Sequence, residues 1–220
     1  MRKENIWVVI PAYNEDRNIG KIIKKTKRYV NKIIVVDDGS KDKTFDVAIR
    51  NKVISFRHIV NLGKGAAIKT GCDFAIKNGA EALILLDADA QHDPNEIPNF
   101  LKSLKDADIV FGYRKRGKQM PLILRFGNLV INKATKLLYN LNLRDTQCGY
   151  RALTRKAYKK IRWIASDYSM ESEMIANVGK KKLKYKEIPI QTIYSDKYKG
   201  TTVLDGIKIV LNMFWWRLTR

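Results

Sequence analysis

The sequence of 220 residues contains little that would suit a secreted or membrane-spanning protein. It has two cysteines, Cys72 and Cys148, which are too few for a disulfide framework and favour a reducing compartment. No run of about 18 apolar residues is present, so no segment is expected to span a membrane. The residues before the apolar run at Ile6 lack the apolar stretch of a signal peptide, which favours a cytoplasmic location.

Acidic residues are also scarce. The 22 Asp and Glu stand against 43 Lys and Arg, which gives a formal net charge of +21. An apolar fraction of 45% excludes a disordered chain, and the length fits one domain with a sizeable core. The excess of positive charge predicts an anionic partner, such as nucleic acid, anionic lipid or a phosphorylated substrate.

Nucleophilic and nucleotide-binding motifs of the common kinds are missing as well. We find no obvious Ser-His-Asp or Cys-His set, and no G-x-x-x-x-G-K-[ST] pattern. In the segment 61–67, however, Gly63 and Gly65 flank Lys64. This pattern favours a close backbone approach at the start of a helix, with Lys64 near a bound phosphate. The alternative is a plain loop-to-helix turn with a solvated lysine.

Short β-branched runs alternate with segments of helical periodicity through the first half of the chain. This alternation predicts a single α/β domain with a Rossmann-like, mostly parallel sheet flanked by helices. Strands are predicted at 6–10, 32–36, 53–59, 82–86 and 109–111, and helices at 19–30, 42–50, 65–78 and from Asp93 onward. The second half is less regular, with helices predicted at 123–139 and 170–178 and extended segments at 150–153 and 185–193.

Polar motifs follow four of the predicted strands at their carboxyl ends, where a sheet of this kind binds its ligands. Their convergence on one edge of the sheet therefore predicts a ligand site. The motifs are 11–15, 37–40, 87–92 and 112–114.

Two carboxylates in the third of these motifs suit a metal ion. Asp87 and Asp89 are two residues apart, so in an extended backbone they share a face, and the amide of Gln91 follows. Oxygen ligands of this kind suit Mg²⁺ or Mn²⁺, which would share the phosphate oxygens of a nucleotide. The alternative is a solvated loop that caps a helix. His92 is expected to be a surface loop residue.

Taken together, these motifs resemble those of family 2 glycosyltransferases with the GT-A fold. The resemblance rests on the order and spacing of Ile10–Glu15 (IPAYNE), Val36–Ser40 (VDDGS), Asn61–Gly65 (NLGKG) and Asp87–Gln91 (DADAQ). The later segment Asp145–Arg151 (DTQCGYR) looks like the D-T-x-x-G-F-[RK] segment of dolichyl-phosphate mannose synthases and dolichyl-phosphate glucosyltransferases, with Tyr at position 150 where Phe is usual. The resemblance implies a catalytic domain over residues 1–202.

The resemblance also implies roles for individual residues. Metal ligation would fall to Asp87, Asp89 and Gln91, and contact with the acceptor phosphate to Arg114 and Arg125. Asp89, Arg114 and Arg125 would form the catalytic set. Nucleotide-sugar binding would fall to Pro11, Ala12, Tyr13, Glu15, Val36, Asp38, Lys64, Asp87, Ala88, Lys197 and Lys199. At the last two positions the family more often has an Arg and a G-x-S-K pattern.

The implied reaction is a metal-dependent, inverting transfer of mannose or glucose from GDP-mannose or UDP-glucose to a polyprenyl or dolichyl monophosphate. A phosphate nucleophile is already ionised at neutral pH, so it needs cationic positioning and no strong general base. Glu171 and Glu173 would either orient sugar hydroxyls or serve as first-turn acids of a helix.

Two other functions are compatible with parts of the sequence. The same fold could use a saccharide or another soluble acceptor, but a neutral hydroxyl would call for a catalytic carboxylate, and the basic run 114–118 argues against it. A nucleic-acid-binding module would explain the charge, but the acidic residues gather at the predicted strand ends and no nucleic-acid motif is present. No nucleic-acid partner is therefore expected.

The last segment, 203–220, is predicted to be an amphipathic helix. One face carries Leu204, Ile207, Leu211, Phe214 and Leu218, as a helix packed on the core would, while Ile209, Met213 and Trp216 lie around the other side. Trp215 and Trp216 beside Arg217 suit the headgroup boundary of a membrane. With the basic run 114–118 and the apolar residues after it, they predict peripheral association with the cytoplasmic face of a membrane. Docking on the domain or on a second subunit, as in a homodimer, is the alternative.

Overall fold

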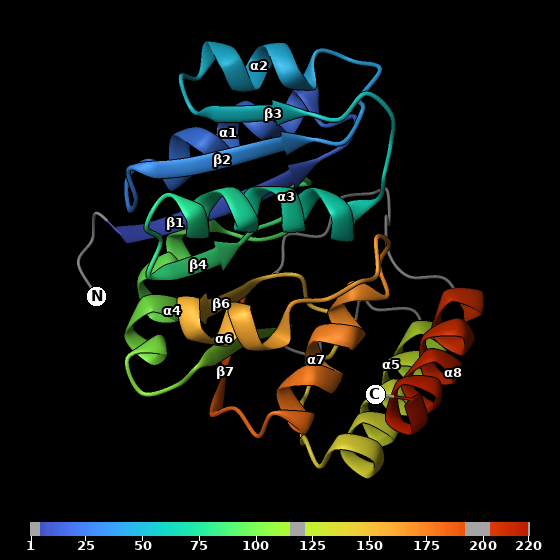
Figure 1. Ribbon diagram of the computed structural model, residues 1–220. Helices are drawn as coiled ribbons and strands as arrows, with labels where there is room; N and C mark the ends of the chain where they lie inside the picture. The colour runs from blue at the N-terminus through green and yellow to red at the C-terminus, as the bar shows by residue number, and fades with distance from the viewer. Residues whose placement is uncertain (1–4, 115–121, 192–202, 220) are drawn as a thin grey trace.

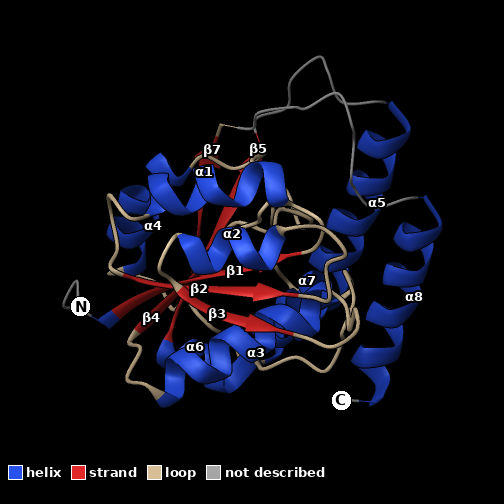
Figure 2. Cartoon of the chain, turned by 90° about the horizontal axis from the view of Figure 1, so that it is seen from above, coloured by secondary structure: helices blue, strands red, loops and turns tan. Residues whose placement is uncertain are grey.

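The protein is described by a computed structural model that covers residues 5–114, 122–191 and 203–219. Within this part of the chain a seven-stranded sheet carries helices on both faces (Figures 1 and 2), as the alternation of strands and helices predicted. The strand order is β3-β2-β1-β4-β6-β5-β7. The strands are β1 (Ile6–Ala12), β2 (Lys32–Asp37), β3 (Ile54–Arg57), β4 (Ala82–Leu85), β5 (Ile109–Arg114), β6 (Arg151–Thr154) and β7 (Tyr185–Ile190).

One strand departs from the parallel arrangement. β6 runs antiparallel to both of its neighbours, β4 and β5, whereas the other pairs are parallel. Ala152 of β6 lies opposite Ile84 on one side and Val110 on the other. The sheet is therefore mostly parallel, as expected, and β6 enters it from the carboxyl edge of the parallel strands.

The helices divide between the two faces of the sheet. Side chains of α1 (Asp16–Thr26), α2 (Thr44–Arg50) and α4 (Ile97–Leu104) share one hydrophobic cluster with Val8 and Ile10 of β1. Trp7 and Val9 of the same strand face a second cluster. Because successive strand residues point to opposite faces, β1 reads as a continuous apolar run that is buried on both sides. The second cluster takes side chains from α3 (Lys64–Lys77), α5 (Leu122–Tyr139), α6 (Arg155–Ile161), α7 (Met170–Lys180) and α8 (Val203–Thr219).

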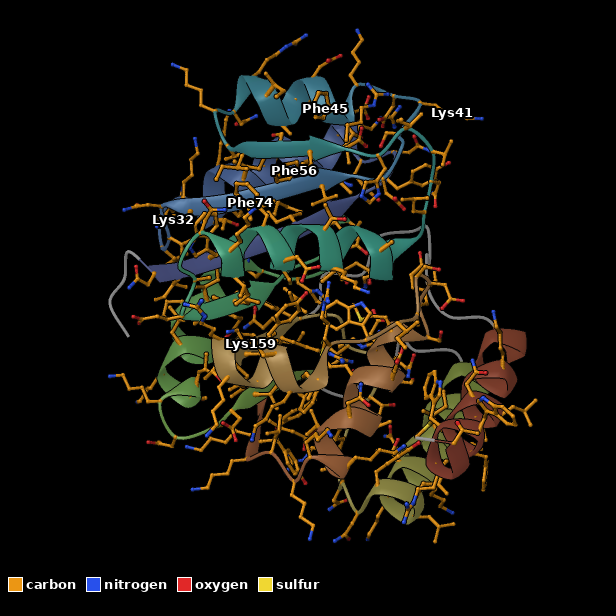
Figure 3. All side chains as sticks on the ribbon, viewed as in Figure 1. Lys32, Lys41, Phe45, Phe56, Phe74 and Lys159 are labelled. Atoms are coloured by element: carbon orange, nitrogen blue, oxygen red, sulfur yellow. The ribbon has the colours of Figure 1, made fainter. Side chains whose placement is uncertain are left out.

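Aromatic side chains fasten α3 to the outer strands. The rings of Phe56 on β3 and Phe74 on α3 (Figure 3) meet edge to face with centroids 4.8 Å apart, and Phe74 meets Trp7 of β1 at 6.1 Å. The ammonium group of Lys32 lies 4.9 Å from the centre of the Trp7 ring. These contacts place the start of α3, and with it Lys64, at the carboxyl edge of the sheet.

Helices α5 and α8 lie side by side at one end of the molecule, next to α7 (Figure 1). Met213 and Trp216 of α8 are buried, and the hydroxyl of Tyr139 donates a hydrogen bond to the Met213 carbonyl at 2.6 Å. Leu211 and Phe214 are exposed. At these two positions, the face that resembled a core-packing one is therefore exposed. Across the described residues, no helix is both long and apolar enough to cross a membrane.

Most predicted boundaries hold to within a few residues. β3 is shorter than the predicted 53–59, and α1 ends at Thr26 rather than at residue 30. The predicted start of a helix at Asp93 is confirmed, since its side chain accepts a hydrogen bond from the Asn95 amide ahead of a short 3₁₀ turn (Pro94–Glu96) and α4. The short helix α6 was not predicted. β7 ends at Ile190, and the end of the predicted strand at 192–193 lies outside the described residues.

Candidate active site

The candidate site lies at the carboxyl edge of the parallel strands, on the right in Figures 1 and 2. The segments that follow β1, β2, β4 and β5 meet there, as the motifs predicted, together with the loops that precede α3 and β6. Direct contacts join them: Asn14 to Ser40, Asp38 to Leu62 and Gly63, Lys64 to Asp87, and Arg114 to Asp145.

A mostly covered lysine, with 17% of its side chain exposed, forms the centre of the site. Lys64 Nζ lies 2.9 Å from Asp87 Oδ1 and 2.9 Å from Glu171 Oε1, so one ammonium group joins the ends of β4, α3 and α7. Burial alone would lower the pKa of Lys64, but the two carboxylates outweigh it and raise the pKa. In the same way, burial opposes the ionisation of Asp87 and Lys64 reverses the effect, so the pKa of Asp87 is lowered. Lys64 and Asp87 are therefore both charged at neutral pH.

Glu171 has a further feature that the sequence did not reveal. Its second oxygen, Oε2, is buried and has no hydrogen-bond partner among the described residues. A carboxylate oxygen held in this state is ready to accept a hydrogen bond from a donor such as a sugar hydroxyl. Glu171 does lie in the first turn of α7, but its unpartnered oxygen also supports the interpretation that it orients a sugar hydroxyl.

Glu173 has a local role instead. Its Oε2 accepts hydrogen bonds from the backbone amides of Ile164, at 3.0 Å, and Ala165, at 2.8 Å. It thus holds the loop that leads into α7.

The two glycines around Lys64 are required by packing against another loop. A Cβ atom on Gly63, whose φ is +97°, would lie 2.5 Å from the Ser166 carbonyl oxygen, and one on Gly65 would lie 2.5 Å from that of Ala165. Trp163 closes the contact, since its Nε1–H donates to the Gly65 carbonyl at 3.0 Å. The predicted close backbone approach is present. Within the described structure its partner is the loop 164–167, which aims Lys64 at the two carboxylates.

Asp38 accepts hydrogen bonds from the loop that precedes α3. Its Oδ1 accepts from the Leu62 amide at 3.0 Å and its Oδ2 from the Gly63 amide at 2.8 Å. His58 Nδ1 lies 2.7 Å from Oδ1, and His58 Nε2 lies 3.1 Å from the Thr70 hydroxyl on α3. Asp38, predicted to bind the nucleotide, therefore also fixes the backbone immediately before Lys64. His58 was missed because a lone histidine after a strand carries no motif.

The other residues predicted to bind the nucleotide differ in accessibility. Tyr13 is exposed at the carboxyl end of β1, where a base could stack on it. Glu15 is buried, and its Oε2 accepts a hydrogen bond from the Asn18 side chain at 2.8 Å. The remaining four contribute backbone and shape, because their side chains are buried in the strands or directly after them: Pro11, Ala12, Val36 and Ala88.

The charge of Asp87 affects the pKa of the neighbouring carboxyl group of Asp89. Burial, followed by the charge of Asp87, raises the pKa of Asp89 to about 6. Its Oδ1 accepts the backbone amide of Gln91 at 3.0 Å, so Gln91 supports the carboxylate through its main chain. A divalent cation beside both carboxylates would relieve their repulsion.

Among the described residues no three His, Cys, Asp or Glu side chains are grouped to hold a metal. The residues present therefore fit Mg²⁺ or Mn²⁺ that takes most of its ligands from phosphate oxygens and water, and do not fit an all-protein site.

His92 is buried, so the prediction of a surface loop residue is wrong. Its ring stacks on Tyr150 with centroids 5.4 Å apart, and Nδ1 lies 3.7 Å from Asp87 Oδ2. Burial lowers the pKa of His92 to about 4 despite the nearby carboxylate, which keeps the ring neutral at neutral pH. His92 therefore adds no charge to Asp87 and acts by packing.

Arg114, which is predicted to contact the acceptor phosphate, is fixed by a carboxylate. Its Nε and Nη2 lie 2.7 and 3.0 Å from the two oxygens of Asp145, a two-point contact between the end of β5 and the loop before β6. Arg125 lies on α5, where its side chain is not described, and Lys197 and Lys199 lie outside the described residues. Their assignments stay predictions.

Arg151 was not singled out individually, although it ends the Asp145–Arg151 segment. It is fully buried and donates to the carbonyls of Thr146, Cys148 and Glu171. Within the described structure no carboxylate lies within 4.0 Å of its guanidinium group. Arg151 thereby ties the loop before β6 to the start of α7, and so links Asp145 to Glu171.

The amino-acid sequence is similar to those of known enzymes. The chain is 32% identical to UDP-N-acetylglucosamine–dolichyl-phosphate N-acetylglucosaminyltransferase of Methanococcus voltae, over 99% of this chain and 98% of that protein. It is 27% identical to polyprenol monophosphomannose synthase of Mycolicibacterium smegmatis, over 94% of this chain and 83% of that protein.

Among solved structures, glucosyl-3-phosphoglycerate synthase of Mycobacterium tuberculosis with Mn²⁺, UDP-glucose and phosphoglyceric acid matches with a TM-score of 0.73. The match covers 96% of this chain and 79% of that one at 18% identity, which establishes a shared fold. Residues 7–162 match the description "Glycosyl transferase family 2". The chain is therefore a glycosyltransferase that belongs to glycosyl transferase family 2.

Proposed function

We propose that this glycosyltransferase moves a sugar from a uridine diphosphate sugar to a polyprenyl monophosphate, with inversion at the anomeric carbon. The observation that carries the proposal is the ion-paired group of Lys64, Asp87 and Glu171 beside Asp89, at the edge where a doubly wound sheet binds its ligands. Full-length relatives named for dolichyl-phosphate and polyprenol substrates support the lipid acceptor.

The site carries carboxylates, so it can bind an anionic sugar donor only if a cation adds positive charge. Asp87 and Asp89 would repel a diphosphate, and Lys64 offsets part of their charge. Mg²⁺ or Mn²⁺ would supply the remaining charge and stabilise the departing nucleoside diphosphate. The chain's own part is to hold the two carboxylates in place through Lys64, Gly149 and the Gln91 amide, and to offer Glu171 Oε2 to a sugar hydroxyl.

The acceptor needs alignment more than activation. Its phosphate oxygen forms the new bond to the anomeric carbon as the bond to the diphosphate breaks, and the diphosphate leaves with the bonding electrons. Such a nucleophile carries its charge already, so no general base is required. In this proposal Arg114, which Asp145 holds at the end of β5, orients the acceptor phosphate, and Arg125 at the start of α5 is the second candidate.

The donor is the point on which the relatives differ. A relative that matches nearly end to end is named for UDP-N-acetylglucosamine, and a structural neighbour was solved with UDP-glucose. The M. smegmatis relative is named for mannose. We therefore choose a UDP-sugar, with N-acetylglucosamine and glucose ahead of mannose.

The test is donor binding by calorimetry, followed by transfer assays. UDP-N-acetylglucosamine, UDP-glucose and GDP-mannose are titrated with Mn²⁺ or with EDTA, into the wild type and into Asp89→Asn. We expect binding of one or both UDP-sugars that is lost in EDTA and in the variant. Transfer should then occur to phytanyl phosphate, and should fail with phytanol, which lacks the phosphate. Transfer to phosphoglycerate but not to phytanyl phosphate, or binding of GDP-mannose alone, would overturn the proposal.

A further inference from the structure

The loop between β3 and α3 exposes an unusual run of apolar side chains. Ile59 is fully exposed, Leu62 is 50% exposed, and Val60 between them is exposed as well. Single exposed apolar residues are ordinary, but three exposed apolar side chains within four residues of one loop are a feature of surfaces that bind a partner or a membrane. This run directly precedes Lys64 and thus borders the site.

A second loop continues the same surface. Ile164 is 68% exposed, and Tyr168 is exposed with its ring 5.8 Å from Lys64 Nζ. The two loops touch, because Gly63 packs on the Ser166 carbonyl and the Ala66 amide donates to it at 3.1 Å. Apolar side chains therefore line two adjoining loops at the rim of the site.

Helix α8 supplies the third part. Leu211 and Trp215 are each 64% exposed, and Phe214 is exposed between them, opposite the buried Met213 and Trp216. An ion pair of 3.2 Å between Lys208 and Asp167 joins this helix to the second loop. We call the three parts the apolar rim, made up of Ile59, Val60, Leu62, Ile164, Tyr168, Leu211, Phe214 and Trp215.

The apolar rim lies on one side of the molecule. In Figures 1 and 2, the loop before α3, the loop before α7 and helix α8 all lie on the right, where the parallel strands end. Lys41, an exposed cation on the turn after β2, points to the same side in Figure 3. That turn packs on the first loop, since a Cβ on Gly39 would lie 2.7 Å from the Val60 backbone. Cations therefore flank the apolar side chains.

We propose that the apolar rim inserts into the headgroup region of an anionic lipid bilayer, with the site opening toward the lipid. The inference rests on the proposed lipid acceptor, whose phosphate must be reached at a bilayer surface. A net charge of +21 with exposed cations such as Lys41 and Lys208 complements anionic headgroups. The same charge opposes docking of a second copy of this chain. Trp215 beside Arg217 has the amphipathic character that favours the headgroup level.

Trp215 provides a native probe of the proposal. The other three tryptophans, Trp7, Trp163 and Trp216, are buried, so quenching of tryptophan fluorescence by brominated lipid reports mainly on Trp215. Vesicles of phosphatidylcholine, with or without about a third of phosphatidylglycerol and without any polyprenyl phosphate, test the surface separately from catalysis. Transfer to a short, detergent-dispersed acceptor phosphate is measured in parallel to test the function.

Two double variants remove apolar side chains from the rim: Ile59→Ser with Leu62→Ser, and Leu211→Ser with Phe214→Ser. Ile49→Ser is the matched control, because Ile49 is also exposed but lies near the end of α2, toward the opposite edge of the sheet. All four rim side chains are exposed, so folding should persist, which thermal unfolding checks.

We expect the wild type to bind the anionic vesicles with quenching of Trp215, and each double variant to bind at least about tenfold more weakly. Ile49→Ser should bind like the wild type, and all variants should keep transfer to the dispersed acceptor. Absence of vesicle binding in a catalytically active wild type would overturn this proposal alone. It would also be overturned if Ile49→Ser lost binding equally, or if a stable dimer shielded Trp215 from a water-soluble quencher. Loss of transfer with retained vesicle binding would count against the proposed function instead.

Discussion

Gly149 lies so close to Asp87 that a Cβ atom at position 149 would be 2.4 Å from Asp87 Oδ2 and 2.9 Å from Lys64 Nζ. The loop before β6 thus leaves room for the ion pair only because residue 149 has no side chain. Its backbone needs no left-handed conformation, so the glycine is required by this contact and not by its φ angle.

Gly149→Ala should therefore damage the site with little effect on folding. The added methyl group must push Asp87 or Lys64 aside, and a displacement of about 1 Å at a reacting centre can cost about 10²-fold in rate. We expect kcat/KM to fall by about that factor while the thermal midpoint changes little. Gly20→Ala is the control, since its Cβ would meet Val47 of α2 at 3.2 Å, away from the site. An equal loss in both variants would contradict the assignment.

Removing the charge of Lys64 should destabilise the fold. In Lys64→Met, Asp87 and Glu171 would face each other without a cation. Breaking a fully buried pair costs about 3–5 kcal/mol, and because Lys64 and Asp87 keep some exposure we expect a loss of about 3 kcal/mol. Urea unfolding at neutral pH measures the loss. Lys69→Met on the same helix should stay within about 0.5 kcal/mol of the wild type. A change of less than about 1 kcal/mol in Lys64→Met would show that the three groups are not coupled as described.

The Arg114–Asp145 pair predicts a pH dependence of stability. Burial would raise the pKa of Asp145, but Arg114 outweighs it and the pKa is lowered. A carboxyl group with a lowered folded pKa stabilises the protein above its unfolded pKa of about 3.9, and this contribution is lost as the pH falls through the folded value.

Asp145→Asn should therefore be less stable than the wild type from about pH 5 upward, and the difference should shrink as the pH is lowered further. Urea unfolding between about pH 3 and pH 7 tests this. Asp106→Asn, which breaks an exposed pair with Lys186, should show almost no difference at any pH. A gap that widens toward acid pH would contradict the lowered pKa.

Both cysteines should be unreactive in the folded protein. Burial raises the pKa of Cys148 to about 12, and it raises the pKa of Cys72 well above its usual value. Because the thiolate is the reactive form, a thiol reagent at pH 8 should label neither residue in the native state and both in urea. Fast labelling of one cysteine before unfolding would show local opening around α3 or the loop before β6.

The sequence predicted the order of strands and helices well, because buried parallel strands and amphipathic helices leave strong periodic signals. It also predicted which motifs meet, since the carboxyl ends of parallel strands share one edge. The antiparallel β6 could not be foreseen, because four residues carry too little pattern to show their direction.

Contacts between motifs were harder to predict than their location. Lys64 reads as a phosphate-binding lysine until Asp87 and Glu171, which are distant in sequence, are seen beside it. The sequence left two interpretations of Glu171 open and gave no signal for His58, because the partners of both residues are distant in the chain. The buried side of α8 could not be predicted because apolar residues surround the helix, and packing on α5 and α7 decides which of them are covered.

The place of β6 in the sheet has a consequence for how the chain folds. The block β3-β2-β1-β4 is built from consecutive segments, and its pairings are complete once residue 85 has left the ribosome. β5 has no strand to pair with until β6 and β7 follow, because β6 separates it from β4. The two parts of the sheet are thus joined by β6, which is synthesised after β4 and β5. The same pairing brings the loop with Asp145 and Gly149 against Asp87, so the site cannot be complete before β6 has joined the sheet.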